Sequence, residues 1–244
     1  MRVLLAAIGF KNGDLEYNKN KILDTITAYK DKADLLVFGE TFLQGFDSLN
    51  WDYEHDSKIA VSVTDPAIQA IRKQAEECSV AVSFGYIEYA DGVIFSSQMT
   101  IGADGQMVDN YRRISEGWKE ESAGSNYQEG QAFHAFEYRG IKYSVALCGD
   151  LWHEQNIEPM RSLRPDVVLW PVYTDFNYQE WNSQVKYEYA EQAAKLGTTV
   201  LYVNSVCLDK DGDEIARGGA AYFQDGIIQS EVPAGKENTL LVTI

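Results

Sequence analysis

The sequence predicts an α/β protein folded as a single layered domain, residues 1–244. Short segments with the period-2 apolar pattern of strands alternate along the chain with segments whose apolar residues recur at helical spacing. Hydrophobic residues make up 45% of the chain, which is enough for a large buried core. No repeat, low-complexity segment or linker divides the chain. Periodicity alone does not distinguish a doubly wound single sheet from two stacked sheets.

The N-terminal segment, residues 1–9, predicts a buried first strand. It resembles the apolar part of a signal peptide, but the run is short and Lys11 and Asp14 follow it at once. No apolar run of about 18 residues occurs in the chain, so the sequence predicts no transmembrane helix. We therefore expect a soluble, cytoplasmic protein with no membrane partner.

The helices are predicted by apolar spacing and by the residues at their ends. Asp65-Pro66 has the pattern of a helix start, with aspartate as N-cap and proline at the first helical position. Pro165 and Gly197 mark the ends of two further helices. The predicted helices cover 14–32, a segment that starts at 65–66, a segment between His153 and Pro165, and a segment from Trp181 to Leu196.

The strands are predicted by alternating or continuous apolar residues bounded by turn residues. They comprise 35–38, 80–86, 93–101, 106–111, 132–138, 141–147, 166–170, 198–204, 218–223, 226–230 and 238–244. Residues 43–63 predict a loop with a short helix. Residues 114–131 have no apolar period and are rich in Gly, Ser and Glu, and a loop of that kind in a compact domain is usually functional.

Charge and composition exclude several classes of function. The formal net charge of −16, with no cluster of Lys and Arg, argues against a nucleic-acid-binding surface. Three widely spaced cysteines suggest neither a disulfide framework nor a zinc site. His55, His134 and His153 form no metal-ligand spacing. We therefore predict no metal, no cofactor and no nucleic-acid partner.

The segment 141–154 carries the first candidate for catalysis. A predicted strand leads directly into Cys148-Gly149-Asp150, where glycine permits a sharp turn and aspartate suits a loop or helix start. A thiol in this position is well placed to act as a nucleophile, because backbone N–H groups of the turn would receive an oxyanion and favour the thiolate. The alternative is a buried structural cysteine.

Two other segments place charged side chains just past predicted strands. Glu40 follows the strand 35–38, and Arg112 and Arg113 end the extended segment at 106–111. A carboxylate, a cation and a thiol in such positions form a coherent catalytic set. For Glu40 the alternative is a solvated charge at the end of a strand.

The motifs around these residues resemble those of the nitrilase, or carbon–nitrogen hydrolase, superfamily. FGETFLQGF looks like the family's glutamate motif and ALCGDLW like its cysteine motif, with CGDLW especially similar to the glutaminase domain of glutamine-dependent NAD synthetases. The resemblance covers essentially all 244 residues. It implies a four-layer α-β-β-α sandwich that commonly pairs into a homodimer or higher homo-oligomer. It also implies a Glu–Lys–Cys triad that cleaves amides and nitriles.

The resemblance assigns the central roles of this chemistry. Cys148 is the expected nucleophile, and Glu40 is the expected general base and acid. Phe38, Phe42 and Phe46 flank the glutamate in the sequence, and an apolar setting of that kind would raise the pKa of its carboxyl.

The cation is the point at which the sequence departs from the family, because Arg113 occupies the position of the expected lysine. Arginine is planar and bulkier than lysine, and it binds carboxylates bidentately. Three alternatives follow: Arg113 stabilises the oxyanion, Lys119 takes over that role, or catalysis is lost. We favour Lys119, because its flexible stem can cross a displaced loop and its compact ammonium fits beside a thiolate.

Further residues have weaker assignments. Glu121 has a spacing from Arg113 similar to that of the family's second glutamate, with Glu120 as the alternative and a solvated loop as the simpler explanation for both. Asp150 resembles the aspartate two residues after the family's cysteine and is expected to be more structural than catalytic. Trp152 and Tyr173 are expected to line the substrate pocket, with core packing as the alternative.

Two classes of function remain open. The first is a thiol amidohydrolase that cleaves the C–N bond of a small linear amide through a thioester acyl-enzyme, in the manner of an ω-amidase or a glutaminase. The second is a catalytically weakened protein of the same fold that binds a ligand or partner. The identity of the cation separates the two.

Overall fold

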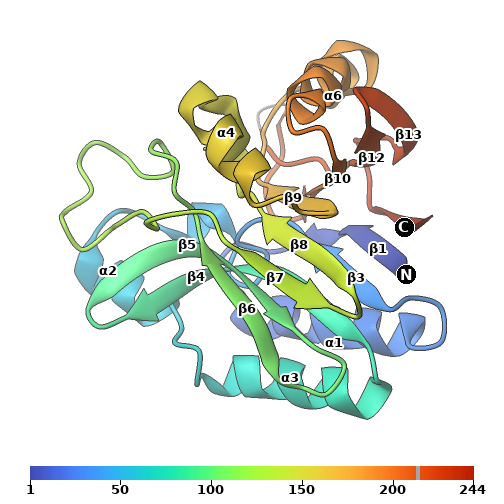
Figure 1. Cartoon of the computed structure of the whole chain (residues 1–244). Coiled ribbons are helices and arrows are strands. Elements are labelled where there is room, and N and C mark those ends of the chain that lie inside the picture. Colours follow the sequence, from blue (N-terminus) through green and yellow to red (C-terminus); the bar gives the residue numbers. More distant parts are fainter. Residues whose placement is uncertain (213–214) are drawn as a thin grey trace.

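Two six-stranded sheets lie face to face between two layers of helices in the computed structural model, which describes residues 1–212 and 215–244 (Figure 1). The first sheet contains, from edge to edge, β14 (Asn238–Thr243), β1 (Arg2–Ala7), β3 (Leu35–Phe38), β4 (Ala81–Ala90), β5 (Val93–Ile101) and β6 (Met107–Arg112). The second contains β13 (Ile227–Val232), β12 (Ala220–Gln224), β10 (Thr199–Asn204), β9 (Val167–Val172), β8 (Ile141–Val145) and β7 (Ala135–Tyr138).

The two sheets share one plan of strand directions. In the first sheet β1, β3 and β4 are parallel neighbours, and the remaining strands pair antiparallel at the two sides. In the second sheet β8, β9 and β10 are the parallel neighbours, again with antiparallel strands at both sides. Parallel strands bring their carboxyl ends to one edge of a sheet, which is where α/β proteins place their sites.

Helices cover the outer face of each sheet. Helices α1 (Leu15–Tyr29) and α3 (Pro66–Cys78) lie on one side of the molecule, and α4 (Glu154–Ser162) and α6 (Lys186–Ala194) lie on the other (Figure 1). As predicted, Asp65 caps α3, its side chain accepting a hydrogen bond from the backbone N–H of Ala67. The four-layer α-β-β-α sandwich is therefore confirmed.

The alternation of side chains along β1 explains why its sequence is apolar on both faces. Val3 and Leu5 pack into the core between the sheets, whereas Leu4 and Ala6 pack into the core beneath α1 and α3. A strand covered on both faces needs an unbroken apolar run, in contrast to the alternating pattern of a strand with one face in water.

Several elements differ from the prediction. The helix predicted for 181–196 is interrupted: α5 (Tyr178–Glu180) continues through one π-helical turn, Trp181–Val185, before α6 begins. The segment 1–9 divides into β1 and β2 (Gly9–Phe10), and β2 pairs with the unpredicted β11 (Val206–Cys207). The loop 43–63, by contrast, contains a short helix as predicted, α2 (Tyr53–Ile59), together with a 3₁₀ turn, Phe46–Ser48.

The long loop at 114–131 is free of helices, and the structure holds it by an isolated bridge between Tyr127 and Ile94. In the part of the chain that the structure describes, no helix is long and apolar enough to cross a membrane.

Candidate active site

The first functional side chain, Glu40, lies just past β3 and is buried, with 1% of its surface exposed. Three donors hold its carboxylate. Ser96 donates from its hydroxyl to Oε1 at 2.9 Å, Arg113 donates from Nη1 to the same oxygen at 3.0 Å, and the backbone N–H of Tyr173 donates to Oε2 at 3.3 Å. The carboxylate is thus fixed by polar groups rather than left as a solvated charge.

The phenylalanines that flank Glu40 in sequence do not form one apolar wall around it. Phe38 and Phe42 pack against each other, with ring centroids 4.8 Å apart, in the core beneath the helices. Phe46 stacks on Tyr173 at 5.2 Å. The expectation of an apolar setting for the carboxylate is therefore wrong, because strand alternation and the turn after Gly39 send these rings elsewhere.

The cation beside Glu40 is Arg113, which immediately follows β6 and has 6% of its surface exposed. Its Nε donates to Ser115 Oγ at 2.9 Å, so the guanidinium is held on two sides. Burial alone would lower the pKa of this guanidinium, but the negative charge of Glu40 raises it above its ordinary value. The group is permanently charged.

Lys119 lies elsewhere, and our preference for it does not fit the structure. Its ammonium donates to the backbone carbonyl of Tyr127 at 2.8 Å and pairs with Glu129 at 2.9 Å. The loop after Arg113 does not fold its amine toward Cys148. We favoured Lys119 on the assumption that the loop after β6 moves the cation away from the position of Arg113. In the structure Arg113 contacts Glu40 directly from the end of β6, so no second cation is needed there.

The second glutamate of the prediction is not at the site either. Glu121 and its alternative Glu120 are exposed on the loop, and neither side chain bonds to another group in the described part of the chain. Their position supports the simpler explanation, a solvated loop.

The candidate nucleophile, Cys148, begins the 3₁₀ turn that follows β8. Its backbone is left-handed, with φ at 43°, and the indole N–H of Trp170 donates to its carbonyl at 2.9 Å. A non-glycine residue held in this region marks a turn that the surrounding structure enforces, and such turns cluster at active sites. The thiol donates to the carbonyl of Tyr173 at 3.4 Å.

The thiol is neutral in the resting protein, contrary to the expectation of a thiolate. Burial and the negative charge of Glu40 raise the pKa of Cys148 to about 12, and the opposing charge of Arg113 only partly compensates. Glu40 is thus the carboxylate whose charge the Cys148 thiol senses.

Asp150 ties the cysteine turn to the arginine segment, as its structural assignment predicts. Its fully buried carboxylate accepts from Tyr111 Oη at 2.6 Å, from the backbone N–H groups of Ile114 at 3.2 Å and Ser115 at 2.8 Å, and from Leu147 N–H at 2.8 Å. Burial raises the pKa of this carboxyl, and the bond from Tyr111 opposes the rise. One side chain thus fixes the position of the cysteine turn relative to the segment that carries Arg113.

A pocket of about 410 Å³ opens at Cys148. Trp152 and Tyr173, the two predicted pocket residues, both lie in its wall. Its full lining is Cys148, Gly149, Trp152, Tyr173, Thr174, Asp175, Phe176, Val185, Glu188 and Tyr189. Four of these ten residues are aromatic, and the two charged ones, Asp175 and Glu188, are both carboxylates.

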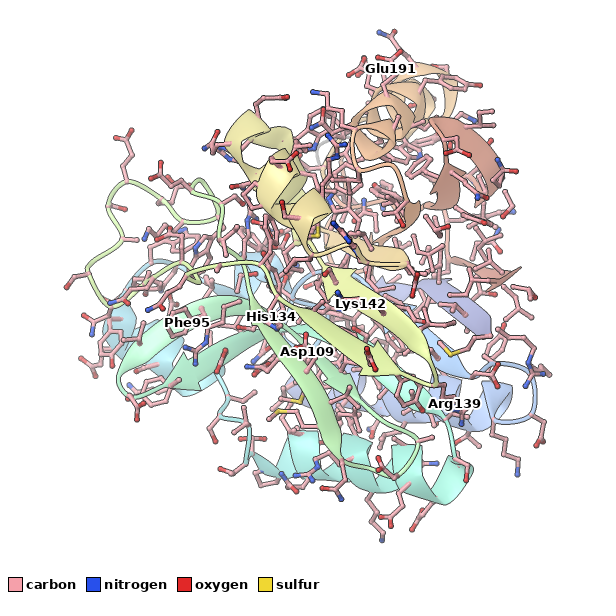
Figure 2. The ribbon with its side chains drawn as sticks, viewed as in Figure 1. Phe95, Asp109, His134, Arg139, Lys142 and Glu191 are labelled. Atoms are coloured by element: carbon pink, nitrogen blue, oxygen red, sulfur yellow. The ribbon has the colours of Figure 1, made fainter. Side chains whose placement is uncertain are left out.

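A larger pocket, of about 620 Å³, is lined by Phe95, Arg112 and His134 among others, and Cys148 is not in its wall. Figure 2 labels Phe95 and His134. The charges in its wall are already paired: Arg112 with Glu88 at 2.7 Å and His134 with Asp109 at 2.6 Å. Among residues 1–212 and 215–244, no group of three or more His, Cys, Asp or Glu side chains has the arrangement of a metal site.

Sequence reasoning missed three members of the site, Ser96, Ser115 and Gly149. Ser96 had a detectable signal, since it lies with Ser97 and Gln98 in a run of polar residues inside a predicted strand, and all three are buried. Buried polar groups require partners, so such a run indicates a hydrogen-bonded site. Ser115 lay in a loop without a pattern.

A family model described as carbon-nitrogen hydrolase matches residues 3–244. Among curated proteins, an (R)-stereoselective amidase from a Pseudomonas species is 24% identical over 97% of this chain and 82% of its own length. A glutamine-dependent NAD(+) synthetase from Acinetobacter baylyi is 20% identical over 97% of this chain, which covers only 42% of the synthetase. The chain therefore spans less than half of that relative.

Solved structures give the same picture of the fold. A glutamine-dependent NAD+ synthetase from Acinetobacter baumannii matches 98% of this chain and 44% of its own with a TM-score of 0.81 at 22% identity. The NitN amidase from Nesterenkonia sp. AN1 matches 100% of this chain and 92% of its own with a TM-score of 0.78 at 16% identity. Another structure of an amidase from that strain shows the result of Michael addition of acrylamide at the active-site cysteine.

Proposed function

The chain belongs to the carbon–nitrogen hydrolase family, and on that basis we propose that it is a thiol amidase whose reaction is carried by Cys148, Glu40 and Arg113. The observation that supports this most is the convergence of the three residues from the ends of β8, β3 and β6. The Glu40 carboxylate is 3.0 Å from the Arg113 guanidinium and shifts the pKa of the Cys148 thiol, so all three act on one another.

In the first half of the proposed reaction, Cys148 Sγ attacks the carbonyl carbon of the amide while Glu40 takes the thiol proton. Negative charge develops on the carbonyl oxygen, and Arg113 and the N–H groups of the cysteine turn are the donors available to it. The C–N bond then breaks, and Glu40 passes its proton to the departing nitrogen. The products of this half are a thioester and ammonia or an amine.

In the second half, a water molecule gives a proton to Glu40 and attacks the thioester carbon. The C–S bond breaks, the sulfur recovers the proton from Glu40, and a carboxylic acid leaves. The atoms balance: one amide and one water give one acid and one ammonia or amine. The neutral resting thiol fits this scheme, because the proton that Glu40 must transfer is on Cys148 before the substrate binds.

The pocket favours a particular kind of amide. Trp152, Tyr173, Phe176 and Tyr189 provide flat apolar surface beside the thiol, and the two charged wall residues are carboxylates. An amide with an apolar or positively charged remainder fits such a wall better than one with a carboxylate. We therefore propose neutral or cationic amides as substrates in preference to glutamine.

One observation favours the second candidate, a catalytically weakened protein that binds a ligand. The Arg113 guanidinium already forms an ion pair with Glu40, so the carboxylate and the cation each have a partner before any substrate binds. Measurement of turnover separates the two candidates.

The test is ammonia release by the purified protein from a panel of small primary amides with neutral, cationic and anionic remainders. We expect turnover of neutral and cationic amides and a thioester mass adduct on Cys148. Cys148→Ala should abolish both, whereas Cys78→Ala, at the far end of α3, should keep wild-type activity. Absence of turnover of every amide by the wild type would favour the binding protein.

A further inference from the structure

We propose that Gly149 is a positioning residue, whose missing side chain makes the space that the Arg113 guanidinium occupies beside Cys148. The inference rests on the proposed function, in which Arg113 acts on the developing negative charge. It assigns a role to a residue that lies in the wall of the pocket and has no side chain of its own to offer the reaction.

The space at Gly149 is filled by the arginine. A Cβ built on Gly149 would lie 2.7 Å from Arg113 Nη2 and 3.2 Å from Ser115 Oγ, and the first of these distances is shorter than Cβ contacts in real proteins. The backbone does not itself require glycine here, because Gly149 is absent from the residues with positive φ, whereas its neighbour Cys148 is among them at 43°. Glycine is therefore needed at residue 149 because the guanidinium occupies the position of a Cβ atom, and not because the backbone has a positive φ.

A side chain at residue 149 would displace the guanidinium and leave the backbone in place. The atom in the way is the terminal nitrogen of a long side chain, which moves more readily than a main chain. That movement would break the bonds that hold Arg113, from Nη1 to Glu40 at 3.0 Å and from Nε to Ser115 at 2.9 Å. The effect of Gly149→Ala should consequently appear in catalysis before it appears in stability.

Lysine at residue 113 would not need this space. The Nζ of a lysine ends near the position of the arginine Cζ, which is 3.6 Å from the Cβ built on Gly149, an ordinary van der Waals distance. The second terminal nitrogen of arginine is the atom that conflicts with a side chain at 149. Arginine at 113 and glycine at 149 thus form a matched pair, and lysine at 113 accepts either glycine or alanine.

The test is a double-mutant cycle of Gly149→Ala, Arg113→Lys and the two together, with Gly124→Ala as control. Gly124 has open space around its Cβ position and no positive φ, so its variant should match the wild type. We expect Gly149→Ala to lower kcat about 10²-fold, in the range for loss of one oxyanion donor, with little change in KM. The double variant should recover at least about tenfold over Gly149→Ala, because the displaced group is gone.

A second measurement keeps the inference testable if no amide is turned over. The pH dependence of iodoacetamide alkylation gives the apparent pKa of Cys148, which the nearby Arg113 charge lowers. Gly149→Ala should raise that pKa, and the double variant should return it toward the value of Arg113→Lys alone. Wild-type kcat and alkylation in Gly149→Ala, or a double variant as impaired as Gly149→Ala, would overturn the inference, whatever the substrate proves to be.

Discussion

Replacing Arg113 and Lys119 separately by methionine distinguishes the cation of the site from a cation of the loop. Methionine keeps much of the aliphatic volume of both side chains and removes the charge. The Arg113–Glu40 pair is buried, with side-chain exposures of 7% and 1%, whereas the Lys119–Glu129 pair is partly in water at 27% and 23%. The two replacements should therefore differ in both stability and rate.

The expected magnitudes follow from burial. Removing one partner of a buried ion pair leaves the other charge unpaired and typically costs about 3–5 kcal/mol, a value that protonation of Glu40 would reduce. Loss of one donor to the oxyanion lowers the rate by roughly 10²–10³-fold. For Lys119 a partly exposed ion pair contributes about 1 kcal/mol or less, and its bond to the Tyr127 carbonyl about 1 kcal/mol more.

Urea unfolding and initial rates of ammonia release measure the two quantities on the same preparations. Arg113→Met should lose most of its activity and unfold at clearly lower urea, whereas Lys119→Met should keep its activity within about twofold. A loss of activity in Lys119→Met, with Arg113→Met still active, would refute the assignment of the cation. It would mean that the loop closes over the site when substrate binds.

Two other predictions follow from the titrating groups. Glu40→Gln should lower amide turnover by at least about 10²-fold. Alkylation of Cys148 at a fixed pH should nevertheless become faster, because the variant lacks the negative charge that raises the pKa of the thiol. A fall in both rates would contradict this prediction. His134 and Asp109 are labelled in Figure 2, and the hydrogen bond to Asp109 raises the pKa of His134. The pair therefore stabilises the fold fully below about pH 6.5, the ordinary pKa of histidine. This stabilisation is lost as the pH rises through the higher pKa that His134 has in the folded protein. His134→Gln should lower the free energy of unfolding by about 1 kcal/mol, because the His134 side chain is 46% exposed although Asp109 is buried. This loss should shrink between pH 5 and pH 9, and a loss that does not vary with pH would argue against the pair.

The sequence predicted the elements that local rules determine. Leu35–Phe38 was predicted with its observed bounds, since a short apolar run between polar residues has one reasonable interpretation, and the cap at Asp65 defined the start of α3. The π turn within 181–196 was not predictable, because apolar spacing at 3.6 residues tolerates one wider turn.

The site was predictable where a side chain follows a strand directly. Glu40 lies two residues past β3 and Cys148 three residues past β8, and each is therefore held at the carboxyl end of a parallel strand in its own sheet. The choice between Arg113 and Lys119 depended on the path of a loop, and a loop without a periodic pattern carries no information about that path. Gly149 was interpreted as a turn residue. The sequence does not reveal that the side chain of Arg113, 36 residues earlier, occupies the space where a Cβ of residue 149 would lie.

The carboxylate of Asp150 also has a consequence for the order of folding. Its partners Tyr111 and Ser115 belong to the end of the first sheet, while Asp150 and Leu147 belong to the second, and 39 residues separate Tyr111 from Asp150. Glu40 and Arg113 follow β3 and β6 of the first sheet, whereas Cys148 follows β8 of the second, so the cysteine meets the other two residues only where the sheets pack together. A chain whose sheets have not yet packed together carries Cys148 with an ordinary thiol pKa, and the packing of the sheets raises that pKa as it buries the thiol beside Glu40.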